Sequence, residues 1–210
     1  VGRTYLITGR TGGFQSIALG ETPIPFFSVY ETSQLVIQDI SLGGAVSALG
    51  DLNTDGYDDF AVSRTQEGRH GELTREGGLL VFYGQQVWGE DTAIIRGDDA
   101  DITVRRADEA AIPEGLVYHG LLAATAGDFN ADGVADLLVG EPMRTLQPVG
   151  SDTLLDVDER GTAYVLFSIT QRGRDAYLSD ASSAIRGEFE FDHFGVLPAS
   201  PGIDLNGDRL

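Results

Sequence analysis

The stretch GDLNTDGYDDFAV, from Gly50 to Val62, combines a run of acidic and amide side chains with a short apolar segment. Oxygen-bearing side chains occupy alternate positions from Asp51 onward, and a short apolar run follows them at once. Side chains at alternate positions of a tight, glycine-containing loop can direct their oxygens toward one centre. The apolar run has the length and branching of a buried strand. The stretch therefore predicts an oxygen-lined loop that ends where a strand begins.

The same stretch recurs at a nearly constant spacing. It returns as GDFNADGVADLLVGEP from Gly127 and as GIDLNGDRL from Gly202 to the last residue. The lead aspartates Asp51, Asp128 and Asp204 are 77 and 76 residues apart. Self-similarity at a fixed period is the signature of solenoids, propellers and other arrays, so the chain is predicted to consist of repeated units.

The flanks of the loop repeat as well. Upstream of each lead aspartate a large residue precedes a glycine, and downstream of the first two loops a glycine opens a β-branched and aromatic run. The N-terminal VGRTYLITG is the same downstream element. The upstream pairs are Leu42-Gly43, His119-Gly120 and Phe194-Gly195, and the downstream runs begin at Gly77 and Gly161. We expect one repeat segment (1–210) that holds the last strand of a preceding unit (1–9), two complete repeats (35–84 and 92–168) and the start of a further one (183–210).

The loops have the chemistry of a calcium site. Six to eight hard oxygens from positions 1, 3, 5, 7 and 9 suit Ca²⁺, whereas Mg²⁺ requires stricter octahedral geometry. Gly56 and Gly133, at position 6, are predicted to adopt positive φ. The predicted ligands are Asp51, Asn53, Asp55, the Tyr57 carbonyl and Asp59 in the first loop, and Asp128, Asn130, Asp132, the Val134 carbonyl and Asp136 in the second. This gives about two Ca²⁺ ions per chain.

The loops have two other possible interpretations. Plain Asn/Asp/Gly turns without a metal remain the alternative. An EF-hand is excluded because it needs a glutamate at position 12, where Val62 and Val139 stand, and flanking helices. A third loop, with Asp204, Asn206 and Asp208, is predicted to be incomplete because Arg209 replaces its glycine.

The charge composition of the chain argues against certain classes of partner. The chain carries 33 acidic and 14 basic residues, the latter all arginine, for a formal charge of -19. Such a surface repels nucleic acid and anionic membranes and favours cations, although solubility in salt is an alternative reason for it. There is no cysteine and no apolar run long enough to cross a bilayer. We therefore expect neither a nucleic-acid partner nor membrane insertion.

The order of these motifs resembles the FG-GAP repeats of the integrin α-subunit β-propeller and its bacterial relatives. The likeness rests on the Phe194-Gly195 element, the Asp-x-Asn-x-Asp-Gly-x-x-Asp loops, and Gly140-Glu141-Pro142 after the second of them. The first repeat departs from the pattern, with Val62-Ser63-Arg64 where Gly-x-Pro is expected. The resemblance implies an all-β fold, namely a partial β-propeller of four-stranded blades with Ca²⁺ in the loops.

The resemblance also implies an unclosed ring. The chain holds about three blades' worth of sequence, whereas propellers close with four to eight blades. We expect a fragment of a longer protein, or other chains that supply the missing blades. The repeats are longer than the family norm, and we expect the extra length in the loops 98–115 and 143–160, which are rich in charged and turn residues.

Three functions remain open. The leading interpretation is an extracellular, calcium-stabilised propeller segment that serves as a protein-interaction or cell-adhesion scaffold, with an unidentified protein or glycan ligand. The alternatives are a lectin-like propeller and an accessory domain of a secreted enzyme. The chain itself is predicted not to be an enzyme, because its histidines follow no metal-ligand spacing, Ser182 and Ser183 lack a nucleophile-elbow context, and its carboxylate clusters are explained by calcium or solvation. Arg96-Gly97-Asp98 spells the adhesion tripeptide RGD, but we interpret it as the counterpart of Arg186-Gly187-Glu188, a shared strand and turn.

Overall fold

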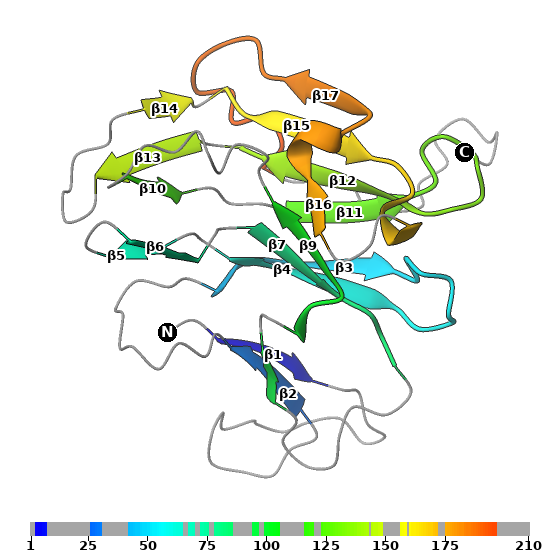
Figure 1. Ribbon diagram of the computed structural model, residues 1–210. Helices are drawn as coiled ribbons and strands as arrows, with labels where there is room; N and C mark the ends of the chain where they lie inside the picture. Colours follow the sequence, from blue (N-terminus) through cyan, green and yellow to red (C-terminus); the bar gives the residue numbers. More distant parts are fainter. Residues whose placement is uncertain are drawn as a thin grey trace, which may run out of the picture.

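The regular structure of the chain is β-strands with short 3₁₀ turns (Figure 1). The computed structural model describes residues 3–7, 26–30, 42–64, 67–69, 72–75, 78–85, 94–96, 99–105, 116–119, 123–142, 144–148, 156–158, 160–171 and 175–196. No helix within these ranges is long and apolar enough to cross a membrane. The predicted all-β class is confirmed.

Two units of four antiparallel strands form the centre of the molecule, the first within a five-stranded sheet and the second as a four-stranded sheet. We call them the first and second blades. The first blade has the strand order β3-β4-β7-β9 and the second has β11-β12-β15-β17. The strands of the first are β3 (Leu42–Gly50), β4 (Asp59–Arg64), β7 (Gly78–Phe82) and β9 (Ile102–Arg105). Those of the second are β11 (Ala123–Gly127), β12 (Asp136–Glu141), β15 (Thr162–Leu166) and β17 (Ser183–Arg186).

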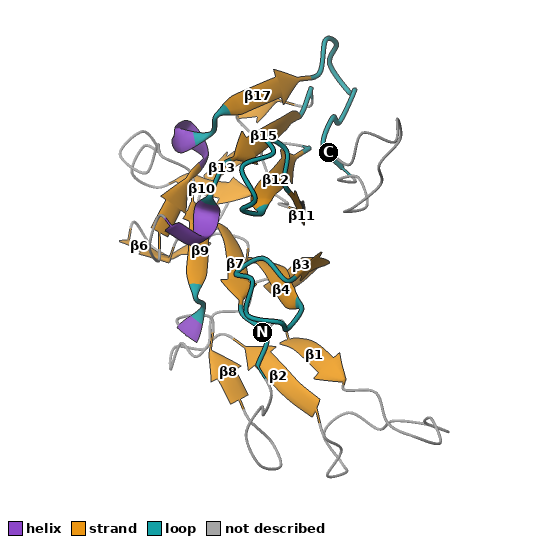
Figure 2. Cartoon of the chain, turned by 90° about the vertical axis from the view of Figure 1, so that its right-hand side faces the viewer, coloured by secondary structure: helices purple, strands orange, loops and turns teal. Residues whose placement is uncertain are grey.

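A third sheet lies on the other side of the first blade (Figure 2). It has the order β1-β2-β8 and consists of β1 (Arg3–Ile7), β2 (Phe26–Tyr30) and β8 (Ile94–Arg96). In the chain β8 comes between β7 and β9 of the first blade, yet it pairs in parallel with β2. Likewise β16 (Asp175–Tyr177) comes between β15 and β17 and pairs in parallel with β9. The segment before the last strand of each blade therefore pairs with the edge strand of the preceding sheet. That edge strand is β2 for β8 and β9 for β16.

A salt bridge strengthens the link between the blades. The Arg105 Nε and Asp175 Oδ1 atoms are 3.1 Å apart, and they join β9 of the first blade to β16. At the other end of the blades, the Ala124 backbone N–H of β11 donates to Ser47 Oγ of β3 at 3.2 Å. The two blades are thus connected both at their first strands and at their outer edges.

Four further strands come from the connections between the second and third strands of each blade. In the first blade these are β5 (Glu67–Arg69) and β6 (Glu72–Arg75), and in the second they are β13 (Arg144–Pro148) and β14 (Asp156–Asp158). They lie at the left of Figure 1, where β13 also pairs with β10 (Leu116–His119). The expectation that 143–160 is loop is therefore wrong, and 98–115 likewise contains β9. In 143–160, β13 pairs both with β14 and with the more distant β10, and β9 pairs with β7 outside 98–115; local composition does not reveal such partners.

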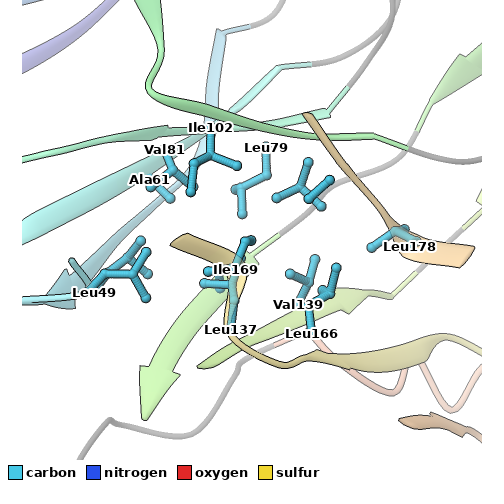
Figure 3. Packing of buried hydrophobic residues seen from close by; sticks show 14 residues of the cluster. Leu49, Ala61, Leu79, Val81, Ile102, Leu137, Val139, Leu166, Ile169 and Leu178 are labelled. Carbon is cyan, nitrogen blue, oxygen red and sulfur yellow. The ribbon is translucent and has the colours of Figure 1, made fainter. Parts of the chain in front are cut away.

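The main core lies between the two blades (Figure 3). Apolar side chains from one face of the first blade meet those from the facing side of the second, and the 3₁₀ turns η3 (Ile169–Gln171) and η4 (Leu178–Asp180) add one each. The labelled members are Leu49, Ala61, Leu79, Val81, Ile102, Leu137, Val139, Leu166, Ile169 and Leu178. Because this core joins two sheets face to face, neither blade buries it alone.

The opposite face of the first blade carries a second apolar cluster. It contains Phe60 and Phe82, whose rings are stacked with centroids 5.2 Å apart, together with Val62, Leu80 and Ala100. As both faces of the first blade are covered, every residue of β4 is buried. In contrast, every residue of β17 is exposed. The outer side of the second blade is thus open in this chain, and the described residues form no closed ring.

The Phe-Gly element packs against the second blade. Phe194 bridges Gly161, and its N–H donates to the Arg160 carbonyl at 3.0 Å. Gly195, with φ 89°, lies so close to Gly140 that a Cβ on Gly140 would stand 1.9 Å from the Gly195 carbonyl oxygen. The glycines of the Phe-Gly and Gly-x-Pro elements therefore permit one close contact. The unit boundaries at 1–9, 35–84, 92–168 and 183–210 stay predictions.

The RGD tripeptide is not equivalent to the later RGE. Arg96 ends β8, which pairs in parallel with β2, whereas Arg186 ends β17, which pairs antiparallel with β15. The two tripeptides are similar in sequence but lie at different positions in the fold, so the predicted equivalence is wrong. Gly97 and Asp98 lie outside the described residues.

Candidate metal centre

Each candidate loop connects the first and second strands of a blade. Residues 51–58 join β3 to β4, and residues 128–135 join β11 to β12. Both loops lie at the right of Figure 1. Asp204, Asn206 and Asp208 of the third loop lie outside the described residues.

The first-position aspartate organises each loop by accepting two backbone hydrogen bonds. Asp51 Oδ1 accepts from the Asp55 N–H at 2.9 Å, and Oδ2 accepts from the Gly56 N–H at 2.8 Å. The second loop repeats this arrangement at Asp128, with 3.0 Å from Asp132 and 2.9 Å from Gly133. The carboxylate oxygens thereby accept hydrogen bonds from backbone N–H groups that find no backbone acceptor in a turn of this length.

The third and fifth positions form further local turns. Asn53 Oδ1 accepts from the Asp55 N–H at 3.0 Å, and Asp55 Oδ1 accepts from the Tyr57 N–H at 2.9 Å. The Asn53 amide also donates to Asp55 Oδ2 at 2.8 Å. In the second loop the corresponding distances are 2.9, 2.8 and 2.9 Å. The two loops thus share a hydrogen-bond network contact by contact, although they are 77 residues apart in the chain.

The backbone turns sharply at two positions of each loop. Gly56 and Gly133 have φ of 93° and 83°, so the predicted positive φ at position 6 is confirmed. Position 4 also lies in the left-handed region, with φ of 61° at Thr54 and 60° at Ala131. This second turn was not predicted, because neither threonine nor alanine favours positive φ.

The ninth-position aspartates are buried, with exposures of 1% for Asp59 and 0% for Asp136. Asp59 Oδ2 accepts from the Leu52 and Asn53 N–H groups at 2.8 and 3.3 Å, while Oδ1 accepts from the Gly84 N–H at 2.7 Å. Each such aspartate therefore ties its loop to the residues that follow the third strand of the blade.

The second loop has the matching pair of contacts. Asp136 Oδ2 accepts from the Phe129 N–H and Oδ1 from the Ser168 N–H, both at 2.9 Å. Gly84 and Ser168 were not predicted as part of either site. The only signal for them is their common place two residues beyond the third strand, which becomes visible once Phe82 and Leu166 are aligned by strand pairing.

Two carboxyl groups are perturbed in opposite directions. Burial raises the pKa of Asp59, against the lowering effect of its backbone donors. The side-chain hydrogen bond from Asn130 lowers the pKa of the exposed Asp132, and the Val134 N–H acts in the same direction. The exposed carboxylate is therefore the one held most readily in its charged form.

The donor set fits a hard cation in its chemistry. Each carboxylate oxygen has two lone-pair directions, and the contacts above leave acceptor capacity on the first-, third- and fifth-position side chains. Within the described residues, no three acidic or histidine side chains converge tightly enough to hold a metal on their own. A cation would need amide and carbonyl oxygens too, as the predicted set of Asp, Asn and backbone carbonyl supplies. The ligand assignment stays a prediction.

The chain is similar to proteins with FG-GAP repeats. Residues 122–166 match the family model described as FG-GAP repeat, which covers the second loop and strands β11 to β15. Integrin alpha-X of Mus musculus is 31% identical over 104 residues, which make up 50% of this chain and 8% of the relative. Integrin alpha-10 of Homo sapiens is 28% identical over 150 residues, 69% of this chain and 12% of the relative. No solved structure matches.

A second group of relatives are enzymes by name. Phosphatidylinositol-glycan-specific phospholipase D of Rattus norvegicus is 28% identical over 200 residues, which are 93% of this chain and 20% of the relative. The chain thus spans a fifth or less of the length of these relatives. Together with the repeated loops and the four-stranded blades, the matches support an FG-GAP repeat family for this chain, with residues 122–166 as the matched repeat.

Proposed function

We propose that the chain is a calcium-binding propeller segment in which each loop between the first two strands of a blade holds one Ca²⁺. The observation that carries the proposal is the matching set of hydrogen bonds made by the first-, third- and fifth-position side chains of the two loops. In both, backbone N–H groups orient a set of oxygen-bearing side chains. Calcium would neutralise the clustered carboxylates and rigidify the loop, a structural and not a catalytic role.

The proposal extends to the location of the protein and to its partners. Sites built from a few exposed carboxylates are filled by the millimolar calcium outside cells and left empty by cytosolic levels. The formal charge of -19 favours cation uptake further. An extracellular scaffold for protein interaction or cell adhesion is the role we propose, supported by the likeness to integrin alpha chains. Its ligand would be a protein or a glycan.

One observation favours a second candidate. The match to phosphatidylinositol-glycan-specific phospholipase D takes in 93% of this chain, a larger share than either integrin match above. The segment would then be an accessory domain beside a catalytic domain, and again would not itself be the enzyme.

The nature of the ligand is a separate question. Binding assays with glycans, run in parallel with assays of candidate proteins, distinguish an adhesion scaffold from a lectin-like propeller.

The calcium proposal is tested by melting the 210-residue chain in EDTA and in millimolar CaCl₂ and by counting bound ions. We expect a rise in Tm and about two Ca²⁺ per chain. Asp55→Ala and Asp132→Ala should each remove one ion and part of the rise in Tm. Asp58→Ala is the matched control, because Asp58 is an exposed carboxylate at position 8 of the first loop, where the second loop has Ala135. If both ligand variants bind calcium like the parent, the proposal is wrong.

A further inference from the structure

The residue two positions beyond the third strand touches the metal loop in both blades. Gly84 donates its N–H to Asp59 Oδ1 at 2.7 Å, and Ser168 donates its N–H to Asp136 Oδ1 at 2.9 Å. Phe82 and Leu166 occupy equivalent places, because they pair with Phe60 and Leu137, the second residues of β4 and β12. Gly84 and Ser168 are therefore structural counterparts.

Ser168 and Gly84 differ in their side-chain contacts with the loop. The Ser168 hydroxyl donates to Asp132 Oδ2 at 3.2 Å, which brings a group from outside the loop to the fifth-position carboxylate. Gly84 has no side chain, and the first loop leaves no room for one. A Cβ on Gly84 would stand 2.3 Å from the Asp58 carbonyl oxygen and 2.8 Å from Tyr57 Cβ. Of the two described loops, only the second thus has this hydroxyl contact.

Ser168 makes the contact from an unfavourable backbone conformation. Its φ is 51°, in the left-handed region where glycine is at an advantage over serine. The Asp136 contact uses only the Ser168 N–H, which glycine also possesses. The side chain is therefore not required for the part of the arrangement that the two blades share, and its separate contribution is the hydrogen bond to Asp132.

We propose that Ser168 is a positioning residue for the second calcium site and makes that site bind calcium more tightly than the first. Asp132 Oδ2 receives both the Asn130 amide and the Ser168 hydroxyl, so the orientation of the carboxylate is fixed from two directions. Asp132 Oδ1 receives the Val134 N–H and keeps one lone pair for the cation. In the first loop, Asp55 Oδ2 receives the Asn53 amide but no hydroxyl from outside the loop. This inference rests on the proposed calcium function.

The experiment is calorimetric titration of the 210-residue chain with CaCl₂ in an Asp55→Ala background, in which the second site is titrated alone. Outer hydrogen-bond partners of ligating carboxylates contribute about 10-fold or more to metal affinity. We expect Ser168→Gly and Ser168→Ala to weaken calcium binding by about 10-fold. Ser183→Ala, on exposed β17, is the matched control and should bind like the background chain.

Melting in EDTA separates positioning from a general structural role. Because glycine relieves the positive φ, Ser168→Gly should melt in EDTA at or above the Tm of the background chain while its calcium affinity falls. A purely structural serine would lower both quantities together, and that result would overturn the proposal. So would unchanged affinity in Ser168→Gly when Asp132→Ala abolishes binding, which leaves the calcium function intact. If Asp132→Ala also binds normally, the calcium function itself fails, and this inference with it.

Discussion

Asp59 and Asp136 are carboxylic acids placed where a loop enters a buried strand, with almost no exposed surface. A buried carboxyl group is costly unless its oxygens are hydrogen-bonded. Here both oxygens of each group accept backbone N–H groups, from the loop on one side and from the residue beyond the third strand on the other. At the residue scale, the ninth position therefore stabilises the blade whether or not a cation is present.

Asp136→Asn tests this role of the ninth position. An amide offers one acceptor oxygen in place of two, so either the Phe129 or the Ser168 N–H loses its partner. We expect a loss of about 1–3 kcal/mol in the free energy of unfolding, already in EDTA. Urea unfolding with and without calcium measures it. Asp132→Ala, at an exposed position, should change stability mainly when calcium is present, and equal losses for both variants in EDTA would contradict the distinction.

Gly133→Val tests the backbone of the loop. No atom lies within 4 Å of a Cβ built on Gly133, so the substitution meets no steric obstacle and its effect comes from φ alone. A β-branched residue at φ 83° should lower the free energy of unfolding by about 1–3 kcal/mol. Gly133→Asn is the control, since asparagine tolerates the left-handed region. Thermal melting should rank the parent first, Asn next and Val last.

At the scale of elements, the blades depend on glycines that let two segments meet. The Phe-Gly element reaches the second blade because Gly140 of β12 and Gly195 have no side chains between them. In the first blade Ser63 takes the place of Gly140, as the pairing of β4 and β12 shows, and its hydroxyl accepts the Ala45 N–H at 2.6 Å. The predicted alignment of Val62 with Gly140 is therefore wrong by one residue, and the first repeat uses this position differently.

Gly140→Ala is expected to displace the Phe-Gly element from the second blade. The new Cβ would stand 1.9 Å from the Gly195 carbonyl oxygen, a backbone atom that cannot rotate away. We expect a loss of about 1–3 kcal/mol in the free energy of unfolding and faster amide exchange at Phe194. Gly127→Ala is the control, because its Cβ would meet only the Phe129 ring, at 3.6 Å. An equal loss in both variants would mean that the close contact is unimportant.

How much of each element could be predicted depends on where its information lies. The loops and the strands after them were predictable, because Asp51, Gly56 and the run from Asp59 carry their constraints within one short stretch. Strands β13 and β16 were not, because each pairs with a strand from another part of the chain, β10 and β9 respectively, and β14 in turn pairs with β13. The place of Ser168 beside Asp132 was hidden for the same reason. The similar sequences around Arg96 and Arg186 also led to the wrong prediction that the two residues are counterparts. The strand pairing corrects it.

At the scale of the whole molecule, the two blades present equivalent faces in different surroundings. Leu52 of the first loop is 0% exposed, whereas Phe129, its counterpart in the second loop, is 49% exposed. Val104 pairs with Leu79 as Ile185 pairs with Ala163, yet Val104 is 0% exposed and Ile185 is 55% exposed. The second blade covers this face of the first, and no described residue does the same for the second. In a repeat architecture such a face is completed by a further unit.

Charge placed on the two equivalent faces should therefore have opposite consequences. Val104→Glu buries a carboxylate between the blades and should unfold the chain, with a loss of about 4 kcal/mol or more. Ile185→Glu should leave the free energy of unfolding within about 0.5 kcal/mol of the parent, because its side chain is already in water. It should also reduce self-association of the chain in sedimentation velocity, since an uncovered apolar face favours contact between copies. Comparable unfolding of both variants would show that Ile185 is buried in solution, and the second blade would then have a covering that the described residues do not provide.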